Sequence, residues 1–345
     1  MQTIQQQFVN LTQQLEQQII GQPRLIERLL IALLADGHLL VEGAPGLAKT
    51  RAIRLLAEHL EGSFHRIQFT PDLLPADLTG TEIYRSQQGV FEFQHGPLFN
   101  NLVLADEINR APAKVQSALL EAMAERQITV GKTTYPLQDP FLVMATQNPI
   151  EQEGTYPLPE AQLDRFLLHI NIGYPSASAE KEILHLARGE AAAAITTNLQ
   201  PAPMSPATPT TPKIPTPAGA TNGNTIISRF QLHQARQQVL KVHLAEELEN
   251  YLLQIILTTR EPQRFGDDLA SWIQYGGSPR ATIALDRCAR SRAWLQGRDY
   301  VTPEDIQDLV FDVLRHRVLL TYEAEAEGIT VDRLTSELLN RIPIP

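Results

Sequence analysis

A glycine-rich segment of eight residues constrains the fold of this 345-residue chain more than any other feature. It lies between an apolar stretch, 38–42, and a segment of helical composition, 51–60. A strand, a glycine-rich turn, Lys-Thr and a helix together form the phosphate-binding loop of NTPases. The glycines let backbone N–H groups surround an anion, and the helix directs its positive N-terminal end at the same place. The segment consists of Gly43, Ala44, Pro45, Gly46, Leu47, Ala48, Lys49 and Thr50.

Three positions decide how well this segment matches such a loop. Lys49 would reach the β- and γ-phosphates, and the Thr50 hydroxyl would help to hold Mg²⁺. Ala48 stands where the pattern G-x-x-x-x-G-K-[ST] has its second glycine, and we expect it to lie in the first helical turn, where alanine costs little. A plain glycine–proline turn is the alternative, but the Lys-Thr pair and the preceding strand favour nucleotide binding.

A second motif follows further along the chain. The apolar run 102–105 ends in two carboxylates, Asp106 and Glu107. An Asp at the end of a strand beside a phosphate loop can hold the Mg²⁺ shell, and a neighbouring Glu can activate water as a general base. A strand followed by a capping Asp would explain the pair by itself. In company with the phosphate loop, the pair favours an NTPase.

Composition and charge restrict the class of protein further. No apolar stretch reaches the ~18–20 residues that span a bilayer, and the start of the chain does not resemble a signal peptide. The single cysteine, Cys288, rules out an internal disulfide and a cysteine-based metal site within one chain. We therefore expect a cytoplasmic protein of two or three domains. The net charge of −10 weighs against a nucleic-acid machine, although an acidic ring can carry a basic pore.

Strands and helices alternate through the first half of the chain. The expected strands are 38–42, 64–69, 102–106, 141–146 and 167–172. The expected helices are 1–20, 25–34, 49–60, 112–125 and about 160–165. The first of them has apolar residues at helical spacing, namely Phe8, Leu11, Leu15 and Ile19. Uniformly apolar strands separated by helices predict an α/β fold with a mostly parallel sheet covered on both faces.

The remaining segments depart from this alternation. Insertions at about 72–99 and 126–139 have the pattern of hairpins, the second around a Gly131-Lys132 turn. Residues 189–225, rich in Pro, Thr and Ala, predict an extended linker, for which a disordered loop is a simpler explanation than a docking segment. From 226 to 345 we expect a separate helical domain without strands, with helices at 232–239, 245–258, 279–294 and 303–320. The first domain accordingly spans 1–188.

These motifs, in this order, resemble those of AAA+ ATPases and, in detail, those of the MoxR group within that superfamily. The resemblance implies an AAA+ P-loop NTPase core followed by an all-α helical lid domain. An alanine before Lys49 is itself usual in that group, whereas the Pro/Thr-rich linker looks like an insertion. Five stretches carry the resemblance and extend over nearly the whole chain outside the linker: 37–50, 104–123, 145–149, 158–166 and 277–281.

The resemblance implies roles for further polar residues. Asn148 matches sensor 1, whose amide orients the attacking water, although an Asn-Pro dipeptide also makes a turn by itself. Arg165 matches an arginine finger that acts on the nucleotide of the neighbouring subunit. A surface ion pair with Glu160 or Asp164 is the alternative explanation of that arginine, but we favour the finger; Arg110 competes for the trans-acting role.

Two more sites follow from the resemblance. Arg280, in Ser-Pro-Arg-Ala, matches sensor 2 and would touch the γ-phosphate in the same subunit. Because a cation is unfavourable at a helix N-terminus, a nearby anion explains this arginine better than solvent does. Gly21 and Gln22 lie where such proteins close over the adenine.

The two insertions correspond to hairpins that line the pore or face the substrate in related rings. Lys132 and Tyr135 in the second, and Phe91 and Phe93 in the first, are candidates for contact. A plain hairpin core explains the two phenylalanines at least as well.

The resemblance finally implies a function. It predicts a ring-forming ATPase, expected to be a hexamer, that uses ATP and Mg²⁺ to remodel or mature a client protein complex, including metal insertion. The partner would carry a von Willebrand factor A domain on another chain. Two alternatives stay open: a nucleic-acid motor, which the acidic charge disfavours, and a nucleotide-gated scaffold with slow turnover, which Glu107 and Arg165 disfavour.

Overall fold

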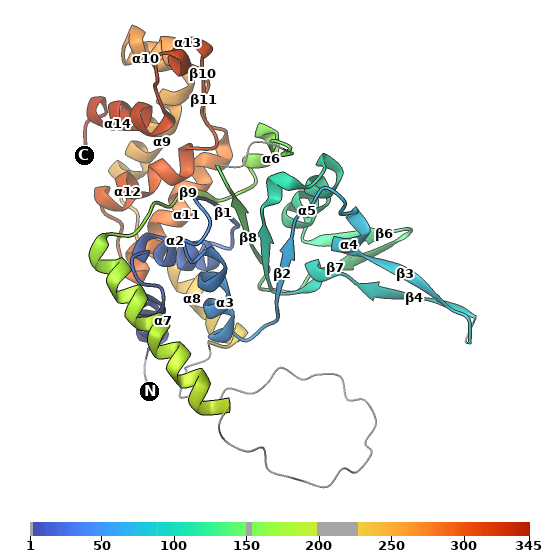
Figure 1. Ribbon diagram of the computed structural model, residues 1–345. Helices are drawn as coiled ribbons and strands as arrows, with labels where there is room; N and C mark the ends of the chain where they lie inside the picture. Colours follow the sequence, from blue (N-terminus) through green and yellow to red (C-terminus); the bar gives the residue numbers. More distant parts are fainter. Residues whose placement is uncertain (1–2, 88, 150–153, 199–226) are drawn as a thin grey trace.

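A five-stranded parallel sheet forms the centre of the first domain (Figure 1). The computed structural model describes residues 3–149, except 88, and residues 154–198 and 227–345. The strand order is β2-β5-β8-β1-β9, and the central strands are almost entirely buried. All five expected strands are confirmed, as β1 (Leu39–Glu42), β2 (Phe64–Gln68), β5 (Leu102–Asp106), β8 (Leu142–Gln147) and β9 (Leu168–Asn171).

Alternate residues of the strands supply two separate cores, one on each face of the sheet. Leu39, Leu104 and Met144 pack with the N-terminal helices and the lid on one face. Leu40 and Val103 pack with helix α5 and the insertions on the other. The covering helices are α1 (Ile4–Gln18), α2 (Pro23–Leu34), α3 (Lys49–Glu58) and α5 (Ala113–Glu125), with short turns η2 (Ile108–Arg110) and α6 (Glu160–Leu163). The α/β architecture expected from the sequence is therefore confirmed.

Both insertions form antiparallel hairpins, as expected. In the first, β3 (Gly80–Arg85) pairs with β4 (Val90–His95) between α4 (Pro75–Thr79) and η1 (Pro97–Phe99); in the second, β6 (Gln127–Val130) pairs with β7 (Thr133–Pro136). They project together from one side of the molecule (Figure 1). The Phe93 and Tyr135 rings stack at 4.3 Å, so these two candidates join the hairpins to each other. Phe91 is 69% exposed and Lys132 lies exposed in its turn, which leaves both accessible.

The second domain is mainly helical but contains two strands that the sequence did not suggest. A short antiparallel pair joins β10 (Ile273–Tyr275) to β11 (Leu319–Leu320). The helix expected to reach residue 320 therefore ends at Leu314, because the apolar residues after it enter the strand pair. The helices are α8 (Arg229–Leu240), α9 (Glu246–Arg260), α10 (Asp267–Trp272), α11 (Pro279–Leu295), α12 (Pro303–Leu314), α13 (Tyr322–Ala326) and α14 (Val331–Arg341), with the turn η3 (Pro262–Arg264).

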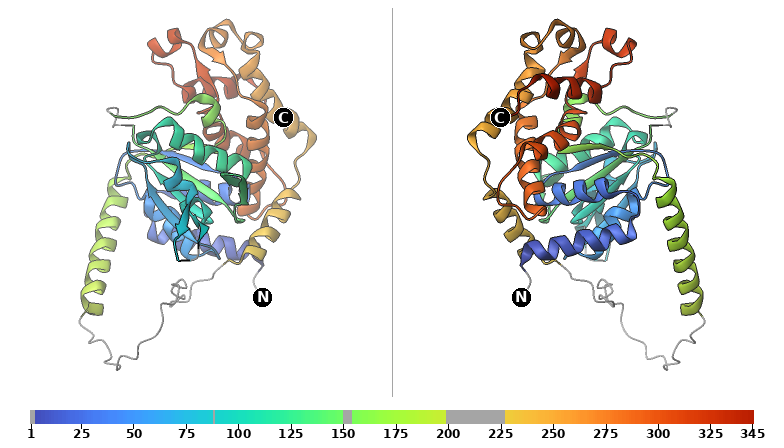
Figure 2. Two further views of the ribbon diagram at one scale, coloured as in Figure 1. Left: turned by 90° about the vertical axis from the view of Figure 1, so that its right-hand side faces the viewer. Right: turned by 90° about the vertical axis from the view of Figure 1, so that its left-hand side faces the viewer.

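The expected linker is wrong over its first ten positions. Helix α7 (Ala177–Asn198) continues through 189–198 and stands apart from the body of the molecule (Figure 2). Alanine has the highest helix propensity, and the run 191–194 extends the helix where we expected extended chain. The rest of the expected linker, 199–225, lies outside the described residues. Across the part of the chain that is described, no helix is both long and apolar enough to cross a membrane.

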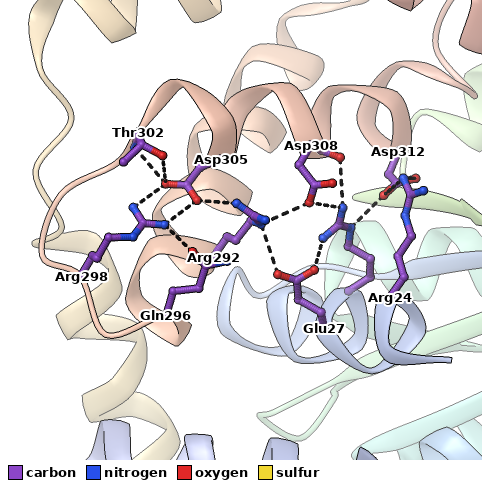
Figure 3. A network of polar contacts seen from close by, with 10 residues as sticks. Arg24, Glu27, Arg292, Gln296, Arg298, Thr302, Asp305, Asp308 and Asp312 are labelled. Atoms are coloured by element: carbon purple, nitrogen blue, oxygen red, sulfur yellow. Dashed lines mark hydrogen bonds and ion pairs between the residues drawn. The ribbon is translucent and has the colours of Figure 1, made fainter. Parts of the chain in front are cut away.

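A network of buried charges joins the N-terminal helices to the lid (Figure 3). Arg28 of α2, fully buried, donates from Nε to Asp312 Oδ2 at 2.8 Å and from Nη2 to Asp308 Oδ2 at 2.7 Å. Arg292 of α11 continues the chain of contacts to Glu27 and Asp305. Burial opposes the charged form of Arg28, but attraction to Asp312 and its neighbours outweighs it and raises the pKa. The lid is thereby tied to the helix that leads into β1.

Candidate active site

The segment Gly43–Thr50 connects the carboxyl end of β1 to the start of α3. A Cβ added to Gly43 would lie 2.5 Å from Ile172 Cγ1 and 2.8 Å from its carbonyl oxygen, so only glycine fits there. Gly46 has a φ of +84°, a backbone conformation that favours glycine. No atom lies within 4 Å of a Cβ added there, so the space around it is open. The strand–loop–helix geometry expected of a phosphate loop is therefore present, and its backbone faces open space.

 Ala48 does not lie in the first right-handed turn of α3 but caps that helix in the left-handed region, with φ 59° and ψ 15°. That conformation explains why glycine is the usual residue here, because a left-handed L-residue costs roughly 1–2 kcal/mol. The loop therefore holds its alanine under backbone strain, as sites for bound ligands often do.

Lys49 lies at the centre of a group of acidic side chains. Its Nζ donates to the Gly43 carbonyl oxygen at 2.5 Å, which folds the side chain back over the loop. Burial lowers the pKa of Lys49, while attraction to Asp106, Glu107 and Glu42 opposes that shift. The phosphate loop and the acidic pair, far apart in sequence, thus meet at one end of the sheet. We call this end, where the strands finish, the carboxyl edge.

Asp106 ends β5 with its carboxylate largely buried. Its Oδ1 accepts a hydrogen bond from Thr146 Oγ1 at 2.6 Å, and its Oδ2 accepts two from Arg66, at 2.6 and 3.0 Å. Thr146 comes from β8, which lies between β5 and β1 in the sheet. The carboxylate is therefore held in one orientation by side chains of both neighbouring strands.

Glu107 follows in a strained backbone conformation. Its φ is 58°, and its N–H donates to Thr146 Oγ1 at 2.9 Å. Its Oε2 accepts from Gln68 Nε2 at 2.6 Å and lies 3.2 Å from Arg110 Nε. The left-handed turn directs this side chain away from the course of β5, and Gln68 and Arg110 then hold the carboxylate.

Three of these contacts were not anticipated from the sequence. Arg66 and Gln68 lie on β2, and Thr146 lies on β8, and all three orient the acidic pair. The signal that could have identified them is the strand order, because β2 pairs with β5 in a register that sets Gln68 beside Asp106. Thr146 stands within the stretch 145–149 that carried the family resemblance, but only its neighbour Asn148 was assigned a role.

Three other residues expected near the nucleotide, namely Asn148, Gly21 and Gln22, also lie at the carboxyl edge. Asn148, which is buried, directly follows β8. Gln22 donates from Nε2 to the Gly173 carbonyl oxygen at 2.9 Å, and a Cβ on Gly21 would lie 2.8 Å from Pro175 Cβ. The turn before α2 thus packs against the chain that leaves β9. This arrangement leaves Gly21 and Gln22 on the same side of the sheet as the phosphate loop.

Arg165 and Arg280 lie at the other end of the sheet. Both line a cavity of about 330 Å³ together with His38 and Leu167. His38 directly precedes β1 and Leu167 directly precedes β9, so the cavity is at the end where these parallel strands begin, which we call the amino edge. Arg165 donates from Nη1 to the Leu120 carbonyl oxygen at 2.7 Å.

This location corrects the role expected for Arg280. Its Nη1 lies 3.8 Å from Asp164 Oδ2, and its side chain is 57% exposed. Contact with the phosphates of its own chain would require it to cross the sheet, whose four-residue strand β1 is by itself about 13 Å long. The anion near this helix start is therefore a carboxylate of the same chain, and the described conformation does not support a contact with the γ-phosphate in the same subunit.

The donor set at the carboxyl edge fits a magnesium nucleotide. Mg²⁺ prefers oxygen ligands and takes only one or two from the protein, with phosphates and water completing the shell. Asp106 and Thr50 supply such oxygens, and the loop is open at Gly46, where no atom lies within 4 Å of an added Cβ. Thr50 and Asp106 would hold the ion, and the half-exposed side chain of Arg66, which now pairs with Asp106, could turn toward solvent to make room for it.

Together, the fold and this edge define a P-loop NTPase with an attached lid. A family model described as "ATPase family associated with various cellular activities (AAA)" matches residues 38–168, and one for the AAA lid domain matches 270–338. The Chaperone MoxR1 of Mycobacterium tuberculosis is 44% identical over 95% of this chain and 79% of its own length. The Protein MoxR of Methylorubrum extorquens is 31% identical over 95% of this chain and 92% of its own.

A solved structure agrees with these relatives. The crystal structure of a putative ATPase from Cytophaga hutchinsonii has a TM-score of 0.83 and 43% identity, and the match covers 99% of this chain and 96% of that one. The chain belongs to the MoxR family of AAA+ ATPases.

Proposed function

We propose that this protein hydrolyses Mg-ATP at the carboxyl edge of its sheet. Lys49 binds the phosphates, Thr50 and Asp106 hold Mg²⁺, Glu107 activates the attacking water and Asn148 orients it. Bound Mg²⁺ supplies charge neutralisation at the β- and γ-phosphates. The remaining loop residues, together with Gly21 and Gln22 beside the adenine, hold the nucleotide in place.

One observation carries this proposal. The ammonium of Lys49 is attracted by both Asp106 and Glu107, although three other strands separate Lys49 from these two residues in the sequence. A phosphate-binding cation beside an ordered carboxylate pair is what metal-assisted phosphoryl transfer requires. Thr146 supports the same use, because it fixes Asp106 through its hydroxyl hydrogen and Glu107 through its oxygen.

The opposite location of the arginines supports a ring, which we propose to be a hexamer. A residue at the amino edge is too far from the nucleotide of its own chain but is free to meet that of a neighbouring copy. We assign Arg165 as the trans-acting finger and add Arg280 at the same interface. Arg110 is the weaker candidate, because it is engaged by Glu107 of its own chain.

We further propose that turnover remodels or matures a client protein complex in the cytoplasm, including metal insertion, with a partner that carries a von Willebrand factor A domain. The printed name of the Mycobacterium tuberculosis relative, a chaperone, supports the remodelling activity. The exposed Phe91 and Lys132 on the projecting hairpins are the proposed contacts with the client.

The first experiment separates binding from hydrolysis. Glu107→Gln should retain ATP affinity while its turnover falls by at least ~100-fold, because an amide is not a general base. Glu121→Gln on the exposed face of α5 is the matched control and should hydrolyse ATP normally. Normal turnover in Glu107→Gln would refute the assignment of the base.

The second experiment identifies the client. ATP-loaded Glu107→Gln protein is used to capture partners from native lysate, with Lys49→Ala as the nucleotide-free control, and they are identified by mass spectrometry. Capture of a von Willebrand-type protein or an immature metalloenzyme only in the ATP state supports the proposal. Nucleic acid with repair proteins would favour the motor, and capture independent of ATP would favour the scaffold.

A further inference from the structure

One buried arginine of the lid, Arg317, holds the segment that carries Arg165. It lies in the turn after α12, and its side chain is 2% exposed. Its Nε donates to Asp164 Oδ1 at 2.8 Å, and its Nη2 donates to the Phe166 carbonyl oxygen at 2.5 Å. Its Nη1 reaches the Leu167 carbonyl oxygen at 3.1 Å. A single side chain of the lid thus contacts the residue before Arg165 and the two residues after it.

Neighbouring lid residues also contact the segment 164–167. The hydroxyl of Ser278 donates to Asp164 Oδ2 at 2.9 Å from the start of α11. The His316 ring nitrogen Nε2 lies 3.0 Å from the Phe166 carbonyl oxygen. Residues 164–167 are therefore held from two different helices of the lid, and Asp164 is the point where both meet.

The other side of the segment is fixed to the α/β domain. The Leu167 N–H donates to the His38 carbonyl oxygen at 2.8 Å, and Arg165 itself donates to Leu120 of α5. The segment consequently forms one of the joints between the two domains. A change in the angle of the lid would reach Arg165 through Arg317 before it could reach the phosphate loop, which lies at the opposite edge.

We infer that Arg317 is a positioning residue for Arg165, through which the lid controls how this arginine is presented to the neighbouring subunit. The inference rests on the proposed function, in which Arg165 acts on the nucleotide of that neighbour. Arginine suits the task because its planar fork donates in several fixed directions at once. A lysine could keep the ion pair with Asp164 but could not also contact the carbonyl groups of Phe166 and Leu167.

The test mixes subunits that are defective at different edges. Lys49→Ala lacks the phosphate-binding lysine at the carboxyl edge but keeps an intact amino edge. Arg317→Met keeps the loop, so we expect ATP binding within about threefold of wild type and a kcat lowered ~100-fold, the effect of a misplaced catalytic group. When the two proteins are mixed, the intact phosphate loop of an Arg317→Met subunit can face the correctly placed Arg165 of a Lys49→Ala subunit. ATPase activity should then return.

Two further mixtures and one single variant make the outcome specific. Arg165→Ala with Lys49→Ala should also recover activity, which tests the trans role by itself. Glu107→Gln with Lys49→Ala should not, because both subunits fail at the same edge. Arg264→Met, which removes an exposed ion pair with Glu261 within the lid and away from residues 164–167, should keep normal activity alone.

The outcomes separate the two ideas. Failure of the Arg165→Ala mixture would refute the trans-acting arginine and with it the proposed function of the amino edge. Recovery there without recovery in the Arg317→Met mixture would refute only the positioning role. Should Arg317→Met lose its fold, Arg317→Lys replaces it, and the same mixture should recover activity from a smaller initial loss; no recovery would count against the inference.

Discussion

Gln68 forms a hydrogen bond with one of the two carboxylate oxygens of Glu107, the proposed general base. Its Nε2 donates to Glu107 Oε2 at 2.6 Å, and this contact is solvent-exposed. This hydrogen bond uses one of the two carboxylate oxygens that can accept from a water. The side chain of a neighbouring strand therefore restrains the carboxylate of the proposed base.

Removal of this restraint gives the first prediction. Gln68→Ala should raise basal kcat by up to about tenfold, because one charge-assisted hydrogen bond is worth roughly 1.5 kcal/mol. Steady-state ATP hydrolysis at saturating ATP measures the change. Gln127→Ala on the exposed face of β6 serves as the control. A kcat that falls in Gln68→Ala would mean that Gln68 helps the reaction instead of restraining it.

Ala48 gives a prediction about stability. Its left-handed backbone should relax in Ala48→Gly, raising the free energy of unfolding by up to about 1 kcal/mol. Ala52→Gly, four residues later in the right-handed interior of α3, should lower it by about 1 kcal/mol or more. Thermal unfolding of both variants compares the two effects, and a lower midpoint for Ala48→Gly would contradict the strain.

At the scale of elements, His38 joins the start of β1 to two of its neighbours. Its Nδ1 accepts a hydrogen bond from the Val143 N–H at 3.1 Å, and its Nε2 faces the Met123 carbonyl oxygen at 3.3 Å. These contacts suit a neutral ring that donates from Nε2. Burial, aided by the charge of Arg126, lowers the pKa of His38 from 6.5 to about 4.

This shift predicts acid sensitivity. Between pH 6.5 and 4 the unfolded chain binds a proton at His38 that the folded chain does not, so stability falls as the pH falls through that window. The loss reaches about 3 kcal/mol at most. His38→Gln should flatten the pH dependence of urea unfolding, and exposed His65→Gln should not. Some slope will remain, because burial also holds the pKa of His316 well below its usual value.

The same scale shows what a sequence can reveal about this fold. Strong local patterns, such as the apolar strands and the spacing of Phe8, Leu11 and Leu15, predicted the elements correctly. Elements whose identity depends on distant partners were missed: β10 and β11 exist because they pair with each other, and Leu319 alone carries no sign of that. Arg66 and Gln68 escaped notice for the same reason, since their role depends on β2 lying beside β5.

At the scale of the whole molecule, the buried charges between α2 and α12 hold the two domains together. Arg28 and Asp312 are both fully buried, and Arg28 also contacts Asp308 and Glu27. Removing Arg28 would leave the buried Asp312 with only its two more exposed partners, Arg24 and Arg315. The arrangement is therefore costly to break, whatever its net contribution to stability.

The corresponding variant is Arg28→Met. We expect the free energy of unfolding to fall by up to about 3–5 kcal/mol, because Asp312 loses its fully buried partner and keeps only Arg24 and Arg315. Arg54→Met, which removes an exposed pair with Glu58 on α3, should change it by less than about 1 kcal/mol. Urea unfolding followed by circular dichroism distinguishes the two. An equal, small effect in both variants would contradict the structural importance of the network.

The separation of the two edges has an arithmetic consequence. If each reaction centre combines the carboxyl edge of one copy with the amino edge of the next, a lone subunit contains none. An open row of such copies has one centre fewer than its number of subunits, and only closure makes the numbers equal. Specific activity should then rise with protein concentration and level off once assembly is complete, so that dilution acts on this protein as an inhibitor would.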